Sequence, residues 1–281
     1  MPLPTALTPE GQAGLDAILA RPQGALIASD FDGTLSPIVA DPAAARAYPG
    51  AARALARLAA VVGTTAIITG RPAADAVRLG GLGIVPGLIV LGHYGAERWQ
   101  DGKVTAAPPP AGVDEARRLL PGVLASAGAP DGVRIEDKGT ALGVHARLAA
   151  DPDGALAALR APLDALAALA GLTVEPGRYV LELRPPGTDK GAALRALVAE
   201  RAATAALFCG DDLGDLAAFA AIRALRGSGD QAGAGDPVIP GCTVASGSPE
   251  APRVAQAADL AVEGPAGIVQ FLAELAGELG A

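Results

Sequence analysis

Short, wholly apolar segments that end abruptly in polar residues and glycine recur along this chain. Such segments are typical of parallel strands buried on both faces, because helices cover both sides of a parallel sheet. They alternate with stretches in which alanine and leucine recur at helical spacing. Strands are expected at residues 25–29, 64–68, 89–91 and 205–209, and helices at 9–20, at 49–60, after Pro72 and at 190–201. The alternation predicts an α/β fold with a parallel sheet flanked by helices.

The pattern changes between residues 105 and 186, where we expect a smaller, inserted α/β domain. A proline-rich connector, TAAPPPAG at 105–112, opens this segment, and PPG at 185–187 closes it. Between them the pattern predicts helices at 113–120 and 154–170, a strand pair near 134–136 and 141–147, and a strand at 179–183. Apolar and polar residues alternate in 141–147, which predicts a sheet with one solvated face. We therefore assign residues 1–104 and 187–281 to one domain and 105–186 to a second.

Composition narrows the classes of function. The net charge is −8 without a dense basic stretch, so nucleic acid is not an expected partner. Cys209 and Cys242 form neither a disulfide framework nor a zinc motif, which fits a cytoplasmic protein. The first residues lack the basic start and apolar core of a signal peptide. The longest uncharged stretch, 79–96, is interrupted by glycines and Pro86, so we expect no membrane span.

Two carboxylates directly follow the first predicted strand. Asp30 and Asp32 stand in ALIASDFDGTLSPI, after the apolar run 25–29. Loops after parallel strands lie at the edge of the sheet where α/β proteins bind ligands. Carboxylates spaced i, i+2 repel each other unless a cation or a proton relieves the charge, although Asp is also common in turns. The arrangement suits an Asp nucleophile, a second Asp as acid and base, and a magnesium ion.

Polar residues also stand at the end of a second strand and at the start of a helix. Thr69 follows strand 64–68, where its hydroxyl and the N–H groups of Gly70 and Arg71 can bind a phosphate oxygen or cap the next helix. Lys190 stands at a helix start, where the helix dipole disfavours an ammonium unless an anionic ligand is present. A solvated surface lysine is the alternative interpretation of Lys190.

A third group of acids follows strand 205–209. Asp211, Asp212 and Asp215 lie within five residues in GDDLGDLAAF. Three carboxylates after a buried strand are costly unless a cation binds them, and capping of the next helix accounts for only one.

Together these segments resemble the haloacid dehalogenase superfamily of phosphatases and, more narrowly, the trehalose-6-phosphate phosphatases. The resemblance extends from about residue 10 to 275 and rests on DFDGTLSPI (30–38), ITGR (68–71), GHYGAE (92–97), EDKGTALGVHAR (136–147), LELRPPGTDKG (181–191) and GDDLGDLAAF (210–219). Many phosphatases share the dehalogenase-type motifs, whereas the SPI, EDKG…HAR and LELRP segments are more specific. The resemblance implies a Rossmann-like catalytic core with an inserted cap domain.

The resemblance also implies a role for each polar residue. Asp30 would be the nucleophile and Asp32 the general acid and base, and Thr69 and Lys190 would bind the phosphate. The implied cofactor is Mg²⁺, which we assign to Asp30, Asp32, Asp211 and Asp212, with Asp215 as the alternative to Asp212. The implied reaction is hydrolysis of trehalose 6-phosphate to trehalose and phosphate through an aspartyl-phosphate.

Substrate specificity is expected to lie in the inserted domain, acting as a cap. A sugar presents hydroxyl groups, which are matched by charged and amide groups rather than by apolar walls. The candidates are Glu136, Lys138, His145, Arg147, Glu182 and Arg184, joined from the core by Gly70 and Arg71. Each cap candidate can instead belong to a solvated sheet face. His93 and His145 are the only histidines, too few for a histidine metal site, and we expect His93 to support a loop.

The chain departs from the resembled family after Asp212. Gly214, Leu216 and Ala217 stand where the family commonly has Thr, Glu and Asp. We expect metal binding to survive with a changed affinity, because such residues orient the ligands. Two alternative functions stay open: a related phosphatase acting on another phosphosugar, such as sucrose phosphate, and a non-catalytic sugar-phosphate sensor. In each case the partner is a small phosphosugar, and a monomer is expected.

Overall fold

The computed structural model describes residues 3–106, 108, 111–177, 179–227, 238–247 and 252–281. The chain divides into two compact units: a larger unit, Met1–Thr105 with Asp189–Ala281, and a smaller unit, Ala106–Thr188. No helix in the described part of the chain is long and apolar enough to cross a membrane.

The larger unit is built on an eight-stranded sheet in the order β12-β11-β10-β1-β2-β3-β4-β5. Neighbouring strands from β12 to β3 are parallel, and β4 is antiparallel to β3. The strands are β1 (Ala25–Ser29), β2 (Thr64–Ile68), β3 (Ile89–Gly92), β4 (Glu97–Gln100), β5 (Lys103–Ala106), β10 (Ala205–Gly210), β11 (Gly241–Gly247) and β12 (Leu260–Glu263). The four expected strands are confirmed as β1, β2, β3 and β10, and the α/β fold class with them.

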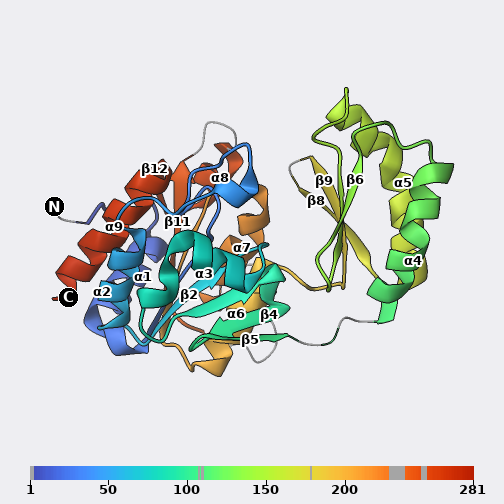
Figure 1. Cartoon of the computed structure of the whole chain (residues 1–281). Helices are drawn as coiled ribbons and strands as arrows, with labels where there is room; N and C mark the ends of the chain where they lie inside the picture. The colour runs from blue at the N-terminus through green and yellow to red at the C-terminus, as the bar shows by residue number, and fades with distance from the viewer. Residues whose placement is uncertain (1–2, 107, 109–110, 178, 228–237, 248–251) are drawn as a thin grey trace. The chain divides into compact units, whose positions relative to one another are not determined.

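Helices cover both faces of this sheet (Figure 1). On one face lie α1 (Pro9–Ala20), α2 (Ala51–Ala59), α3 (Ala73–Gly80) and α9 (Gly264–Glu278), and on the other α6 (Lys190–Glu200), α7 (Leu216–Leu225) and α8 (Pro252–Ala257). Successive residues of β1 alternate between the two cores: Ile27 packs with the first group of helices, and Leu26 and Ala28 with the second. This alternation explains why β1 is apolar at nearly every position.

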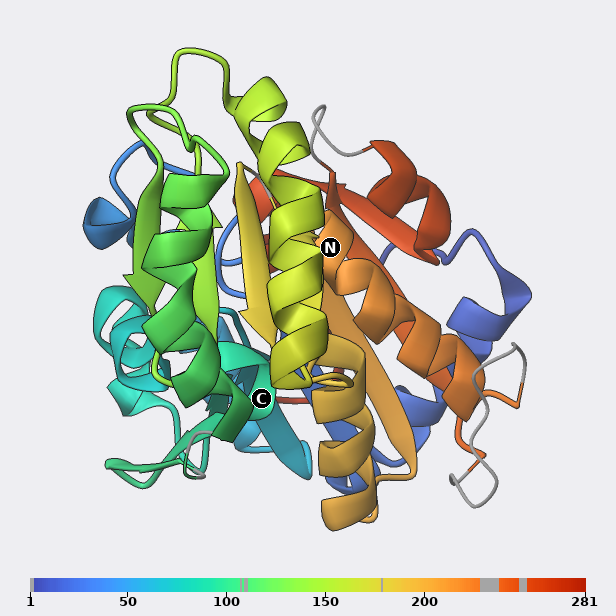
Figure 2. The ribbon, with the colours of Figure 1, turned by 90° about the vertical axis from the view of Figure 1, so that its right-hand side faces the viewer.

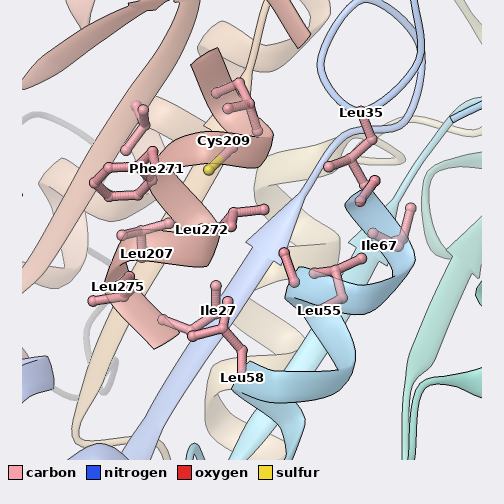
Figure 3. Packing of buried hydrophobic residues seen from close by; sticks show 14 of the residues in the cluster. Ile27, Leu35, Leu55, Leu58, Ile67, Leu207, Cys209, Phe271, Leu272 and Leu275 are labelled. Atoms are coloured by element: carbon pink, nitrogen blue, oxygen red, sulfur yellow. The ribbon is translucent and has the colours of Figure 1, made fainter. Parts of the chain in front are cut away.

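The core on the α2 and α9 side fixes β1 beside β10. Figure 3 shows Ile27 and Leu207, from these neighbouring strands, with Leu58 of α2 and with Phe271 and Leu272 of α9. All five side chains are at most 1% exposed. Truncation of such a side chain to alanine typically costs about 2–5 kcal/mol. The packing therefore holds the ends of β1 and β10, and the loops that follow them, in fixed register.

The smaller unit is a four-stranded antiparallel sheet with two helices on one face (Figures 1 and 2). The sheet order is β6-β7-β9-β8, with β6 (Arg134–Asp137), β7 (Leu142–His145), β8 (Thr173–Gly177) and β9 (Val180–Arg184). Leu142, Val144, Leu181 and Leu183 pack against α4 (Ala111–Ser126) and α5 (Pro152–Ala170). The alternation in β7 thus has the expected basis, with one face against the helices.

The predicted bounds of the connector, 105–112, are wrong at both ends. Thr105 and Ala106 belong to β5, and α4 already begins at Ala111. Residues 107, 109 and 110 lie outside the described residues. The prolines of the segment stand at 108–110, so only there does the sequence remove backbone donors. The residues on either side keep theirs and can continue a hairpin or begin a helix.

Candidate active site

The carboxyl ends of β1 and β10 lie side by side and bring the predicted carboxylates together. Ser29 is in register with Cys209, and the Asp30 N–H donates a hydrogen bond of 2.8 Å to the Cys209 carbonyl. The next strand along the chain, β2, pairs with the other side of β1. Strand order therefore reverses at β1, which is the position where open α/β sheets bind ligands.

Lys190 is buried among carboxylates at this edge. It is the first residue of α6, after the N-cap Asp189, and is 4% exposed. Its Nζ lies 2.9 Å from Asp30 Oδ2 and 2.7 Å from Asp215 Oδ1. Burial alone would lower the pKa of Lys190, but Asp215 and Asp30 raise it well above the ordinary value. The alternative interpretation as a surface lysine is wrong, and Lys190 is a fixed positive charge.

Asp30, Asp211 and Asp215 form a buried carboxylate cluster, with one oxygen of each within 4.8 Å of the others. Burial raises the pKa of Asp30 well above its ordinary value despite Lys190. Burial and the neighbouring carboxylates raise the pKa of Asp211 to about 8, and burial raises that of Asp215 to about 6. One ammonium therefore does not offset three ionised carboxylates, and without a cation the cluster retains protons. Three buried carboxylates fit Mg²⁺, which takes oxygen ligands.

The loop after β1 holds Asp211 in place. The buried Thr34 hydroxyl donates a hydrogen bond of 2.9 Å to Asp211 Oδ1. Gly33 has a φ of +73°, and a Cβ there would lie 1.9 Å from Asp211 Oδ2, so only glycine fits. The Ser246 hydroxyl of β11 donates to the Gly33 carbonyl at 2.8 Å.

The cluster contains Asp215, which the sequence offered as the alternative to Asp212, rather than Asp212. The Asp212 side chain is 61% exposed and caps the short turn 213–215, since its Oδ1 accepts from the Asp215 N–H. In return, Asp215 Oδ2 accepts from the N–H groups of Asp211 and Asp212 at 2.9 and 3.1 Å. This reciprocal capping turns Asp212 outward and Asp215 inward. The i, i+3 spacing of the two acids is the sequence signal that could have identified it.

Asp32 also lies outside the cluster, because its carboxylate is paired with Arg71. Arg71 Nε and Nη2 donate to the two Asp32 oxygens at 2.5 and 2.6 Å, and Nη1 donates to the Pro42 carbonyl at 2.9 Å. Asp32 was expected among the metal ligands and Arg71 among the substrate-binding residues. In the structure the two side chains are paired with each other.

Backbone hydrogen bonds from His93 and Tyr94, which directly follow β3, support the loop after β2, as expected for His93. The Thr69 hydroxyl accepts from the Arg71 N–H at 3.2 Å, which leaves its own hydrogen available to donate. The N–H groups of His93 and Tyr94 donate to the carbonyls of Arg71 and Thr69, each at 3.0 Å. A Cβ on Gly70 would lie 2.7 Å from the Tyr94 hydroxyl oxygen, so a side chain there would collide with the tyrosine.

In the smaller unit, five of the six cap candidates form one charged network on the sheet. Lys138 Nζ lies 2.9 Å from Glu182 Oε1, and Glu182 Oε2 lies 3.9 Å from Arg184 Nη1. Glu136 Oε2 pairs with His145 Nε2 at 2.8 Å and lies 3.8 Å from Lys138 Nζ, which joins the two groups. Glu136, His145, Glu182 and Arg184 lie on three neighbouring strands and Lys138 directly follows β6, which explains why sequence spacing alone did not show their pairing.

Two further positions bear on this network. Gly143 is opposite both Glu136 and Glu182 in the strand register, so no side chain separates the two acids. Arg147, the sixth candidate, follows β7 and is exposed.

Comparison with known proteins identifies the family. A family model described as trehalose-phosphatase matches residues 28–247, which include every candidate site residue. A trehalose-phosphate phosphatase of Mycobacterium marinum is 35% identical, covering 93% of this chain and 65% of the relative. The solved trehalose-6-phosphate phosphatase of Aspergillus fumigatus is 26% identical with a TM-score of 0.69, covering 98% of this chain and 99% of that one.

The fold extends to more distant proteins. A haloacid dehalogenase-like hydrolase from Bacteroides thetaiotaomicron has a TM-score of 0.60 at 17% identity, covering 88% of this chain and 97% of that one, and shows the fold alone. The chain spans 50% and 65% of the length of two curated trehalose-phosphate phosphatases, from Mycobacterium avium and M. marinum. Because the family model covers most of the sequence, the chain belongs to the trehalose-phosphatase family.

Proposed function

We propose that this chain is a Mg²⁺-dependent phosphatase that hydrolyses trehalose 6-phosphate to trehalose and phosphate through an aspartyl-phosphate on Asp30. The observation that carries the proposal is the buried group of Asp30, Lys190, Asp211 and Asp215 at the carboxyl edge of the sheet, in a chain of this family. The names of the relatives support trehalose 6-phosphate as the substrate.

The cofactor would be held by the carboxylates of Asp30, Asp211 and Asp215. When bound, Mg²⁺ would shield the attacking carboxylate from the charge of the phosphate. This set takes Asp215, the stated alternative, in place of Asp212, whose mostly exposed side chain caps the turn 213–215. It leaves out the Asp32 carboxylate, which is paired with Arg71.

In the proposed mechanism these side chains carry out the reaction in two steps. A carboxylate oxygen of Asp30 attacks phosphorus, the bond from phosphorus to the sugar oxygen breaks, and Asp32 gives a proton to that oxygen. Water next attacks the aspartyl-phosphate, Asp32 takes the proton from the water, and the bond between phosphorus and Asp30 breaks. Lys190 stays charged throughout and offsets the charge of the phosphate, while Thr69 donates its hydroxyl hydrogen to a phosphate oxygen.

Residues 105–186 are proposed as a cap that supplies sugar recognition. Glu136, Lys138, His145, Glu182 and Arg184 offer donors and acceptors from one sheet, which suits hydroxyl groups. Arg147 is proposed as an additional contact.

A panel of phosphosugars tests the proposal. Phosphate release is measured from trehalose 6-phosphate, sucrose 6-phosphate and glucose 6-phosphate, with and without Mg²⁺. We expect Mg²⁺-dependent release that strongly favours trehalose 6-phosphate. Preference for another phosphosugar would support a phosphatase of different specificity. Binding of trehalose 6-phosphate without release would indicate a sensor and contradict the proposed activity.

A further inference from the structure

We propose that Arg71 is a positioning residue that acts on the reaction through Asp32, rather than a residue that binds the sugar phosphate. The inference rests on the proposed function, since it assigns a task within the same site. The family resemblance suggested substrate binding for Arg71, and its contacts in the structure point elsewhere.

The Arg71 guanidinium is held by three different residues of the loop after β1. Nε and Nη2 donate to the two oxygens of Asp32 at 2.5 and 2.6 Å, a bidentate pair. Nη1 donates to the Pro42 carbonyl at 2.9 Å, and the guanidinium carbon lies 5.7 Å from the centre of the Phe31 ring. The Arg71 side chain is only 16% exposed. Contacts from three directions fix the plane of the guanidinium, and the bidentate pair fixes the plane of the carboxylate.

This geometry suits orientation of Asp32 better than capture of a ligand. Three of the five N–H groups of the guanidinium already have protein acceptors, which leaves two for any ligand. Asp32 itself is 37% exposed, so its carboxylate remains accessible while Arg71 holds it. Lysine could not replace arginine here, because an ammonium is a point charge and cannot form the fork of two parallel hydrogen bonds.

The paired form of Asp32 corresponds to one stage of the proposed cycle. A carboxylate that accepts from arginine on both oxygens is the form left after Asp32 has given its proton to the sugar oxygen. The same form begins the second step, in which Asp32 takes a proton from water as water attacks the aspartyl-phosphate. Arg71 therefore orients the base for the second step, and its loss should slow breakdown of the aspartyl-phosphate.

A double-mutant cycle tests this assignment. Arg71→Ala and Arg71→Lys are compared with wild type and with Asp32→Asn, and Arg78→Ala is the control, because Arg78 is an exposed arginine of α3 that pairs with Asp75. Both Arg71 variants should lower kcat for trehalose 6-phosphate by about 10- to 100-fold, less than the roughly 100- to 10,000-fold that loss of an acid–base group itself typically costs, with KM changed less than about threefold. Acid quenching during turnover should trap more phosphorylated enzyme than in wild type. In the Asp32→Asn background, Arg71→Ala should cause no further loss.

Other results would overturn the inference. A raised KM with unchanged kcat, or losses that multiply in the double mutant, would show that Arg71 contacts the substrate directly. Unfolding of Arg71→Ala does not decide the question, so Arg71→Lys, which keeps the charge and the stem, carries the test if the alanine variant is unstable. The cycle is also run with p-nitrophenyl phosphate. If wild type hydrolyses that ester but not trehalose 6-phosphate, the proposed substrate is wrong, while the cycle still tests Arg71.

Discussion

Asp211 and Asp215 show how far burial changes the chemistry of single residues. Both lie beside Asp30 with one ammonium, Lys190, to offset three carboxylates. The pKa of Asp211 is raised to about 8, first by burial and then by the neighbouring acids. In an unfolded chain its carboxyl would titrate near 3.9. Between these two values the folded, metal-free chain binds a proton that the unfolded chain does not.

The pH dependence of stability follows from this difference. In EDTA, the free energy of unfolding should fall as pH rises from 6 to 8, by at most about 1.4 kcal/mol per pH unit for Asp211. Mg²⁺ needs the ionised carboxylates, so its stabilisation should be largest at pH 8 and smallest at pH 6. Thermal unfolding at both pH values, with Mg²⁺ or EDTA, measures this, and Asp211→Asn should flatten the dependence. A Mg²⁺ effect that is equal at both pH values, or larger at pH 6, would contradict the cluster as a metal site.

Sequence reasoning placed single residues at the correct edge but not their side-chain directions. Asp30, Thr69 and Lys190 stand where the strand and helix pattern puts them. The pairing of Asp32 with Arg71 joins residues 39 positions apart and depends on how two loops meet, which spacing does not encode.

At the scale of elements, continuous apolar runs were the reliable signal. They predicted β1, β2, β3 and β10, which are buried on both faces. The strands β4 and β5 were missed because their residues are half-buried or exposed and carry no apolar run. β8 was missed for the same reason, since only Val174 of its five residues is buried.

A buried carboxylate outside the site links four elements of the larger unit. Asp259, between α8 and β12, accepts hydrogen bonds from the side chains of Thr8 and Arg226. It also accepts from the N–H and hydroxyl of Thr243 on β11, at 2.8 and 2.7 Å. Burial alone would raise the pKa of Asp259, but Arg226 and these other donors lower it. Its contribution to stability is therefore complete above the unfolded pKa near 3.9 and is lost as pH falls through the lower folded value.

Replacing this carboxylate should destabilise the fold without changing the site. We expect Asp259→Asn to lower the free energy of unfolding by about 3–5 kcal/mol, the usual cost of breaking a buried ion pair. The control is Asp16→Asn, an exposed acid of α1, which should change stability by less than about 0.5 kcal/mol. Urea unfolding at pH 7 measures both. Equal stability of the two variants would show that the Asp259 network contributes little.

At the scale of the whole molecule, the chain contains two compact units, and the smaller one interrupts the larger. The proline-rich boundaries and the change of hydrophobic pattern predicted an insertion at 105–186, and the observed division falls at 106–188. The assignment of catalysis to the larger unit and sugar recognition to the smaller one remains a proposal. Under this assignment, substitutions in the smaller unit should change substrate preference, whereas substitutions in the larger unit should change catalysis on every substrate.

Glu182 is the residue of the smaller unit that best tests this separation. It is buried and pairs with Lys138 at 2.9 Å. Glu182→Ala should reduce kcat/KM for trehalose 6-phosphate by at least about 10-fold, as expected for loss of a charged hydrogen bond, and leave p-nitrophenyl phosphate hydrolysis nearly unchanged. Glu115→Ala on α4 is the control. Equal losses on both substrates would show that Glu182 has a general structural role and not one in sugar recognition.

The most direct measurement is single-turnover phosphate release from trehalose 6-phosphate by wild type and by Asp30→Asn, each with Mg²⁺ and with EDTA. The proposed function predicts release by wild type with Mg²⁺ and none in the other three reactions. Release by Asp30→Asn at the wild-type rate, or release that EDTA does not reduce, would contradict an Asp30-centred, Mg²⁺-dependent phosphatase.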